Sequence, residues 1–171
     1  MRELPDGRLE VFTFKEGLLS RVAHDLMLVM DRFTIRTDGE RVEARFYPES
    51  LRVAGVMQDG KLDRSLPSAR DRDEIVDNVR FKILEIDRHS QATLEATVRD
   101  HGGHRTLDAM LTLHGRSAPL EVEVRERASM WEGEIELRPS EFGIMPFKAL
   151  LGAIKLRDLV RVRFQVPIIP L

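Results

Sequence analysis

The segment close to the C-terminus alternates apolar and polar side chains, and this pattern limits the fold more than any other feature of the sequence. A period of two places successive side chains on opposite faces of an extended strand. The apolar row consists of Val160, Val162, Phe164 and Val166, and the polar row of Arg161, Arg163 and Gln165. We therefore predict a strand over 160–166 with one buried and one exposed face.

The segment before it carries the same period with the opposite charge. Acidic residues alternate with small or apolar ones at Glu132, Glu134 and Glu136. Opposite charges on facing residues stabilise neighbouring strands. The two segments are therefore expected to lie side by side, with the acidic row against the basic row.

Between the two strands, the sequence turns helical in character. Pro146 suits the first turn of a helix, and Gly152 can end it. The apolar residues between and after them recur at helical spacing, at Phe147, Leu150, Leu151 and Ile154. We predict a short helix over about 146–152, which either plugs a core or forms a lid over a cavity.

The rest of the chain consists largely of further alternating segments. Extended segments are expected at 8–15, 24–37, 42–46 and 51–56, and again at 92–98, 107–113 and 120–125. Asp38-Gly39 and the glycine-containing segment 100–104 are typical hairpin turns. Many short strands with regular turns indicate a β-barrel or sandwich, and a barrel is favoured because it removes exposed sheet edges.

One longer helix is predicted, over about 69–82. Ser68 can cap its free N–H groups, and acidic residues follow in the first turns. Ile75, Val79 and Ile83 lie on one face at intervals of four residues. The charged side of this helix is expected to face solvent.

Composition excludes several classes of function. The chain of 171 residues has 27 basic and 29 acidic residues, so its net charge of −2 gives no basis for binding nucleic acid. It has no cysteine, which excludes disulfides, thiolate catalysis and cysteine-ligated metal clusters. The N-terminus lacks an apolar signal region and no stretch is long enough to span a membrane. We expect a soluble cytoplasmic protein, or a periplasmic one if a leader was removed.

Several short motifs follow one another in order along the chain, among them segment 111–120, LTLHGRSAPL, and Ser140-Glu141-Phe142-Gly143-Ile144. They resemble a hairpin and the S-D-F-G-I segment of the YceI-like family of lipid-binding, lipocalin-like barrels. Gly152 and Asp158-Leu159-Val160 resemble its final strand. Further similarities are the charged helix at Asp71-Arg72 that leads to Ile83-Leu84, and His24-Asp25-Leu26. His89-Ser90 stands where family members often have an aromatic residue and a proline.

The resemblance implies a mainly β fold, an extended antiparallel eight-stranded lipocalin-like β-barrel, formed by residues 1–171 as a single domain. It also implies an elongated apolar cavity for a polyisoprenoid or a fatty-acid-like chain. The function expected on this basis is non-enzymatic binding or transport of a lipid-like molecule, with no cofactor.

Inward-facing apolar residues are the candidate contacts for such a ligand, together with one histidine. Small inward residues at Ala92, Ala96, Ala109 and Gly133 favour some internal space. The candidate ligand-binding residues are Phe12, Phe14, His24, Met27, Leu111, Leu113, Trp131, Phe142, Phe147 and Leu150.

The histidines allow other interpretations. His24 is expected to be a buried, hydrogen-bonded residue, because Asp25 next to it points to the opposite face of the strand. His101 and His104 flank a turn and could meet across it, but two ligands do not make a metal site, so none is expected. No catalytic residue is predicted, and an enzyme using His24 with a distant carboxylate is the least favoured hypothesis.

Two alternatives stay open at this stage. Packed protein interiors leave few voids, so the same inward rows would also suit a structural or protein-interaction module with a filled barrel. A long exposed strand edge would allow pairing into a homodimer.

Overall fold

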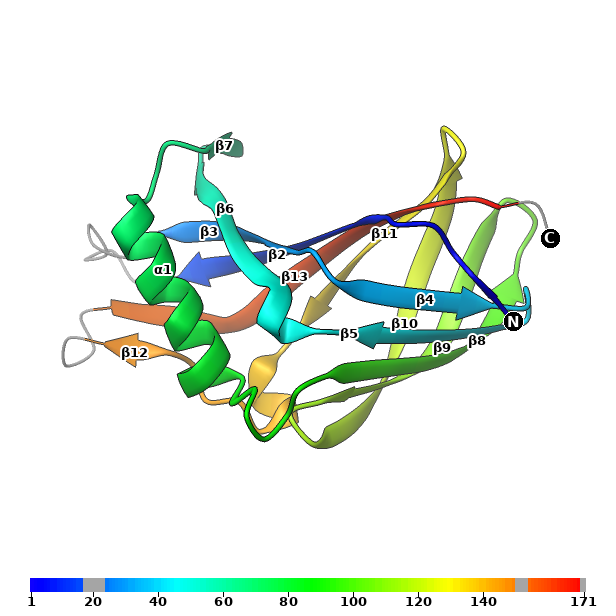
Figure 1. The fold of residues 1–171 in the computed structure, drawn as a ribbon. Helices are drawn as coiled ribbons and strands as arrows, with labels where there is room; N and C mark the ends of the chain where they lie inside the picture. The colour runs from blue at the N-terminus through cyan, green and yellow to red at the C-terminus, as the bar shows by residue number, and fades with distance from the viewer. Residues whose placement is uncertain (17–23, 150–153, 170–171) are drawn as a thin grey trace.

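The structure, a computed structural model, describes residues 1–16, 24–149 and 154–169 and is dominated by antiparallel strands (Figure 1). The first strands are β1 (Arg2–Glu3), β2 (Arg8–Lys15), β3 (Asp25–Met30), β4 (Phe33–Thr37), β5 (Arg41–Phe46), β6 (Leu51–Gln58) and β7 (Lys61–Asp63). The later ones are β8 (Ala92–Asp100), β9 (His104–Leu113), β10 (Arg116–Arg127), β11 (Met130–Leu137), β12 (Lys148–Ala149) and β13 (Ile154–Pro167).

The strands form one curled antiparallel sheet, a half-barrel, which confirms the predicted fold class. Their order is β1-β4-β5-β8-β9-β10-β11-β13-β2-β3-β6-β7, and β12 pairs with β13. The expected count of eight strands differs from the thirteen found in the described residues. The short strands β1, β7 and β12 account for three of the additional strands. The other two arise because the chain is interrupted at 31–32, between β3 and β4, and at 47–50, between β5 and β6.

Strands β3 to β6 together form a long hairpin that is bent in its middle. The expected strand 24–37 divides at 31–32 into β3 and β4, and the 3₁₀ turn η1 (Pro48–Ser50) separates β5 from β6. Because β3 pairs with β6 and β4 with β5, the two halves belong to one hairpin, and a bulge shifts the register of β3 and β6 between Met27 and Leu28. One half extends the sheet from β2 and the other extends it from β8.

The charged rows of β11 and β13 face each other as predicted. Glu136 lies opposite Arg161 and Glu134 opposite Arg163 in the ladder. The Arg161 side chain contacts Glu136 at 3.0 Å and Glu134 at 3.2 Å. This pairing fixes the apolar row of β13 on the inner side of the sheet.

The predicted long helix is confirmed. It begins as α1 (Ala69–Asp77), capped by Ser68, whose Oγ accepts a hydrogen bond from the Asp71 N–H at 3.2 Å. It continues with the wider turns of a π-helix, η2 (Asn78–Ile83). Ile75, Val76 and Val79 pack against the buried residues of β3 and β6, so the helix covers one end of the curled sheet (Figure 1).

The short helix expected over 146–152 is not found in the part that the structure describes. The 3₁₀ turn η3 (Pro139–Phe142) ends at Gly143, which has a φ of 72°. The chain then runs without regular structure to β12. There Lys148 and Ala149 pair with Lys155 and Ile154 of β13, so this part of the expected helix is extended. Residues 150–153 lie outside the described residues.

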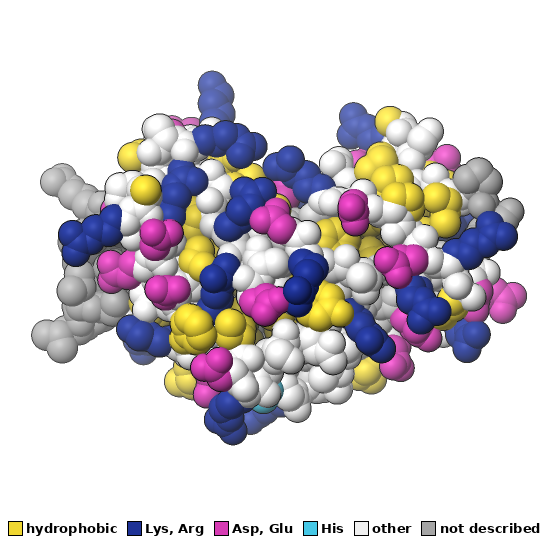
Figure 2. Space-filling view, in the orientation of Figure 1, with side chains coloured by type: hydrophobic (Ala, Val, Ile, Leu, Met, Phe, Trp, Pro, Cys, Tyr) yellow, Lys and Arg dark blue, Asp and Glu magenta, His cyan; other side chains and the backbone are white. Residues whose placement is uncertain are grey.

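The surface mixes charges of both signs. On the face seen in Figure 2, basic and acidic side chains alternate, and apolar groups lie between them. The described helices are all too short or too polar to span a bilayer.

Candidate functional site

The curled sheet encloses an apolar cavity of about 290 Å³. Side chains from β2, β11 and β13 form one wall, where Val162 of β13 lies opposite Val11 on one side and Ile135 on the other. Leu94, Leu111 and other residues of β8 and β9 form the facing wall. The inward rows that the alternation predicted therefore line this space.

Strands β3 to β6 and β10 add further apolar residues, and two segments outside the main strands complete the boundary. Val79, Ile83 and Leu84 reach the cavity from the helical segment. The chain after η3 contributes a second group of lining residues, Ile144, Met145, Pro146 and Phe147. Of these, Met145 is 81% exposed, so this segment also lies at the protein surface.

One hydrogen bond pair holds η3 beside β13. The Asp158 carboxylate accepts a hydrogen bond from the Ser140 N–H at 2.9 Å, and its second oxygen contacts the Ser140 hydroxyl. These residues belong to the two motifs that carried the family resemblance at 140–144 and 158–160. Their role here is to fix the backbone that leads to the cavity wall.

The lining contains almost no polar groups. Thr13 and Arg157 are the polar residues among the described residues around the cavity. Arg157 is exposed, whereas the Thr13 hydroxyl is buried and has no hydrogen-bond partner in the described part of the chain. Such a site can surround a hydrocarbon chain and offer one hydroxyl group to a polar atom of a ligand.

Only part of the predicted ligand-binding set lies at the cavity. Leu111, Leu113 and Phe147 line it. Trp131 and Phe142 do not: Arg105 stacks over the Trp131 ring at 4.3 Å, and Phe142 is 2% exposed within a packed cluster. Leu150 lies outside the described residues.

Phe12, Phe14 and Met27 lie on the opposite, outer side of the sheet. They belong to a small cluster with Val29 and Ala54. The ladder explains this placement, because Phe12 lies opposite Arg161 and cross-strand partners share a face. The outward arginine row of β13 therefore determines that the aromatic row of β2 also points outward, and Arg163 covers the Phe12 ring at 5.0 Å.

His24 is exposed, so the expectation of a buried structural histidine is wrong. It lies just before β3, which begins at Asp25. Asp25 instead accepts a hydrogen bond from the Lys15 N–H at 2.8 Å.

The small residues expected to leave space do not line this cavity. Ala96 and Ala109 face each other in adjacent strands within a buried cluster, and they border a separate, more polar hollow. A Cβ atom at Gly133 would come within 2.6 Å of the Phe164 ring and 2.5 Å of the Glu123 carbonyl oxygen. The internal space lies between larger side chains further along the sheet.

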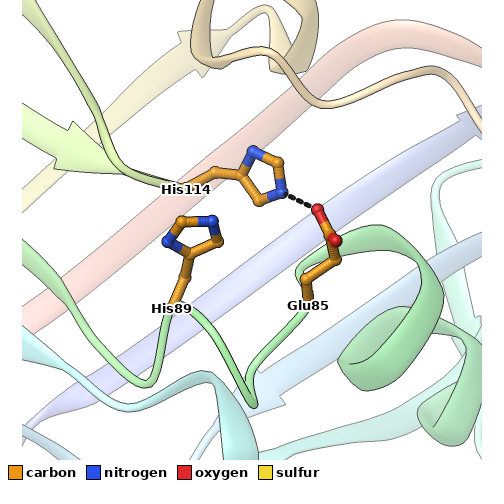
Figure 3. A group of neighbouring side chains, drawn as sticks. All are labelled: Glu85, His89 and His114. Atoms are coloured by element: carbon orange, nitrogen blue, oxygen red, sulfur yellow. Dashed lines mark hydrogen bonds and ion pairs between the residues drawn. The ribbon is translucent and has the colours of Figure 1, made fainter.

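A separate group of titratable residues lies at one side of the cavity wall. Figure 3 shows Glu85, His89 and His114 pointing toward one another, and His114 Nε2 lies 2.7 Å from Glu85 Oε2. The pKa of Glu85 lies below its ordinary value of 4.5, chiefly because His114 donates a hydrogen bond to the carboxylate, and Arg88 adds a smaller effect. The carboxylate is therefore ionised at neutral pH.

Sequence reasoning did not find this group. Glu85 and His89 are four residues apart, but His114 joins them only through the fold. The predicted pair His101 and His104 does meet across its turn, with ring centroids 5.1 Å apart. No third metal-ligating residue joins that pair among the described residues.

Comparisons with known proteins agree with this architecture. The family model of the YceI-like domain matches residues 21–168. The chain is similar to a polyisoprenoid binding domain from Saccharophagus degradans implicated in plant cell wall breakdown, with 14% identity, a TM-score of 0.63 and coverage of 96% of this chain and 95% of that one. It is also similar to BcnA of Burkholderia cenocepacia, with 13% identity, a TM-score of 0.64 and coverage of 95% and 96%. No protein of curated function matches the sequence.

Proposed function

The chain belongs to the YceI-like domain family, and from this premise we propose that it binds one long apolar or amphiphilic molecule, isoprenoid-like or fatty-acid-like, in its cavity without catalysing a reaction. The observation that carries the proposal is the lining itself. Apart from Thr13 and the exposed Arg157, the described residues that surround the cavity are apolar. Water gains few hydrogen bonds in such a space, whereas burying a hydrocarbon chain there is favourable.

The size and shape of the space support a slender ligand. Ligand pockets usually measure roughly 300–1,000 Å³, and the cavity, at about 290 Å³, is just below the lower end of this range. The lining extends from Leu107 in the middle of β9 to Phe147 near the surface. A single extended chain suits this path better than a compact ring system.

The polar atoms favour an amphiphile over a pure hydrocarbon. The Thr13 hydroxyl is buried without a partner in the described part of the chain, so a ligand oxygen beside it would supply the missing hydrogen bond. Arg157 lies in the same lining and is exposed, where it can meet a polar or anionic end group. The solved polyisoprenoid binding domain with the same fold is consistent with this class of ligand.

A matched pair of substitutions tests the location of the ligand. Ala44 lines the cavity, and Ala109 lies in the same buried cluster but away from the cavity. In Ala44→Leu, the added side chain occupies ligand space, so uptake of a fluorescent long-chain fatty acid, displaced by an isoprenoid alcohol, should weaken about tenfold or more.

The control Ala109→Leu should bind the probe as the unchanged protein does. It should instead lose about 1–3 kcal/mol of unfolding free energy, because Ala109 is buried in a hydrophobic cluster whose side chains must shift to admit leucine. Equal probe binding in the two variants and the unchanged protein would contradict a ligand inside this cavity. No uptake by the unchanged protein would favour a filled structural or interaction module.

A further inference from the structure

Three side chains with metal-binding atoms converge from separate parts of the chain beside the cavity wall. Glu85 follows η2, His89 lies in the loop before β8, and His114 is the first residue of the turn between β9 and β10. Their carboxylate oxygen and ring nitrogen atoms all lie within 4.8 Å of one another (Figure 3). This group is independent of the lining residues used for the proposed function.

The hydrogen bonds of His114 orient its ring as a metal ligand. Its Nδ1 lies 3.3 Å from the Phe142 carbonyl oxygen, and its Nε2 points at Glu85. A metal-bound histidine almost always donates its second ring N–H to a carbonyl or carboxylate, which fixes the tautomer. In this structure the Nε2–H donates to the Glu85 carboxylate. A metal ion would take the place of that proton, which is released, while the Nδ1–H donates to the Phe142 carbonyl.

The ring nitrogens of His89 have no other partner in the described part of the structure. Its ring lies beside that of His114, with 4.5 Å between the centroids, and makes no hydrogen bond to any described residue. It also packs against Gly115, where a Cβ atom would come within 3.0 Å of His89 Cε1. Gly115 therefore leaves the room that this ring occupies.

We propose that Glu85, His89 and His114 bind one Zn²⁺ ion, with water in the fourth position. Two imidazoles and one carboxylate suit Zn²⁺, whereas Ca²⁺ and Mg²⁺ prefer oxygen ligands alone. Ligand atoms about 2.1 Å from a tetrahedral ion lie about 3.4 Å apart. The Glu85–His114 pair would therefore open from 2.7 Å, and His89 would move inward.

The ion would join three segments that border the cavity. Leu84 precedes Glu85 and lines the cavity, and Leu113 precedes His114 and lines it as well. The Phe142 carbonyl connects the same site to η3. Bound Zn²⁺ would thus cross-link the end of the helical segment to the turn of β9 and β10 and raise Tm by mass action.

Calorimetric titration of the full chain with zinc chloride, after dialysis against a chelator, tests this assignment. The expected result is one ion per chain and a higher Tm in its presence. Co²⁺ should bind at the same site and show the visible absorption of a tetrahedral ion. His89→Ala and Glu85→Gln should each weaken Zn²⁺ binding by about a hundredfold or more, because each removes an atom that binds the ion directly.

The double variant His101→Ala/His104→Ala is the control, because it removes the other histidine pair. It should bind Zn²⁺ as the unchanged protein does. Circular dichroism checks that each variant is folded, and His89→Ala is the decisive one because its ring contributes no hydrogen bond to the described fold. The proposal is overturned if the unchanged protein takes up no stoichiometric Zn²⁺, or if binding survives in His89→Ala and is lost in the control.

Discussion

At the scale of single residues, Thr13 places a hydroxyl group in a wall that is otherwise made of hydrocarbon. A buried hydroxyl without a partner costs about 1–3 kcal/mol relative to one that is hydrogen-bonded. The Thr13 Oγ1 has no partner among the described residues. A ligand oxygen can therefore recover free energy at this position that the protein alone does not.

We predict that Thr13→Val raises the unfolding free energy of the delipidated protein by about 1 kcal/mol, because valine has the same shape and no unpaired oxygen. Urea denaturation measures this change. Thr37→Val is the control with the opposite sign, since Thr37 Oγ1 donates to the Arg41 carbonyl at 2.7 Å and accepts from the Gly39 N–H at 3.0 Å. A loss of stability in Thr13→Val would show that the hydroxyl already has a partner.

Gly133 is a second residue whose surroundings allow a specific prediction. A Cβ atom there would approach the Glu123 carbonyl oxygen to 2.5 Å, and backbone cannot move aside as a flexible side chain can. Gly133→Ala should therefore lower the unfolding free energy by about 1–3 kcal/mol. If thermal and urea denaturation show no loss, the close packing of Phe164 against this strand is contradicted.

The residue scale also shows where sequence reasoning succeeds and fails. The alternation from Val160 to Val166 identifies the inner face of its strand without further information. The same period in β2 leaves two choices, Leu9 with Val11 or Phe12 with Phe14. The aromatic row looks more like a binding surface, but its pairing with Arg161 turns it outward. Pairing between distant strands, which decides this, is not contained in local periodicity.

At the scale of elements, the helical segment covers the edge of β6 at residues 51–55, before the point where β6 pairs with β7. Arg72 donates hydrogen bonds to the carbonyls of Val53 at 3.1 Å and Ala54 at 3.3 Å. The same guanidinium reaches Pro67 and Leu66, while Arg80 reaches Leu51 at 3.0 Å. Two arginines thus supply donors to strand carbonyls, which is one way to protect an edge.

Arg72→Ala should therefore lower the unfolding free energy by about 2–3 kcal/mol, because several carbonyls lose a charged donor together. Hydrogen exchange should increase first in α1 and β6. The matched control is Arg70→Ala, which removes an exposed arginine from the same helix and should change stability by less than about 0.5 kcal/mol. Equal effects in the two variants would contradict the role of Arg72 at the strand edge.

Helix 69–82 was predictable because capping and periodicity are local signals. Ser68 and the spacing of Ile75 and Val79 determine it without reference to the sheet. The segment at 146–149 is different: Pro146 and Phe147 carry helical signals, but pairing of Lys148 with Lys155 makes the chain extended. Tertiary pairing overrides local propensity there.

At the scale of the whole molecule, the cavity forms where the inward-facing apolar side chains of the curled strands approach one another. Each row is readable from the sequence, and the family resemblance gives their curled arrangement. The remaining volume depends on how lining side chains such as Phe164 and Leu111 fill the interior, which no single row determines. The Glu85–His89–His114 group is a similar case, since its members meet only after the sheet has curled.

The central claim is that this cavity holds a long apolar chain. Mass spectrometry of an organic extract from gently purified protein tests it most directly. We predict an isoprenoid-like or fatty-acid-like molecule at close to one per chain, which Ala44→Leu reduces and Ala109→Leu retains. An extract without lipid, from protein that also takes up no added isoprenoid or fatty acid, would contradict the claim.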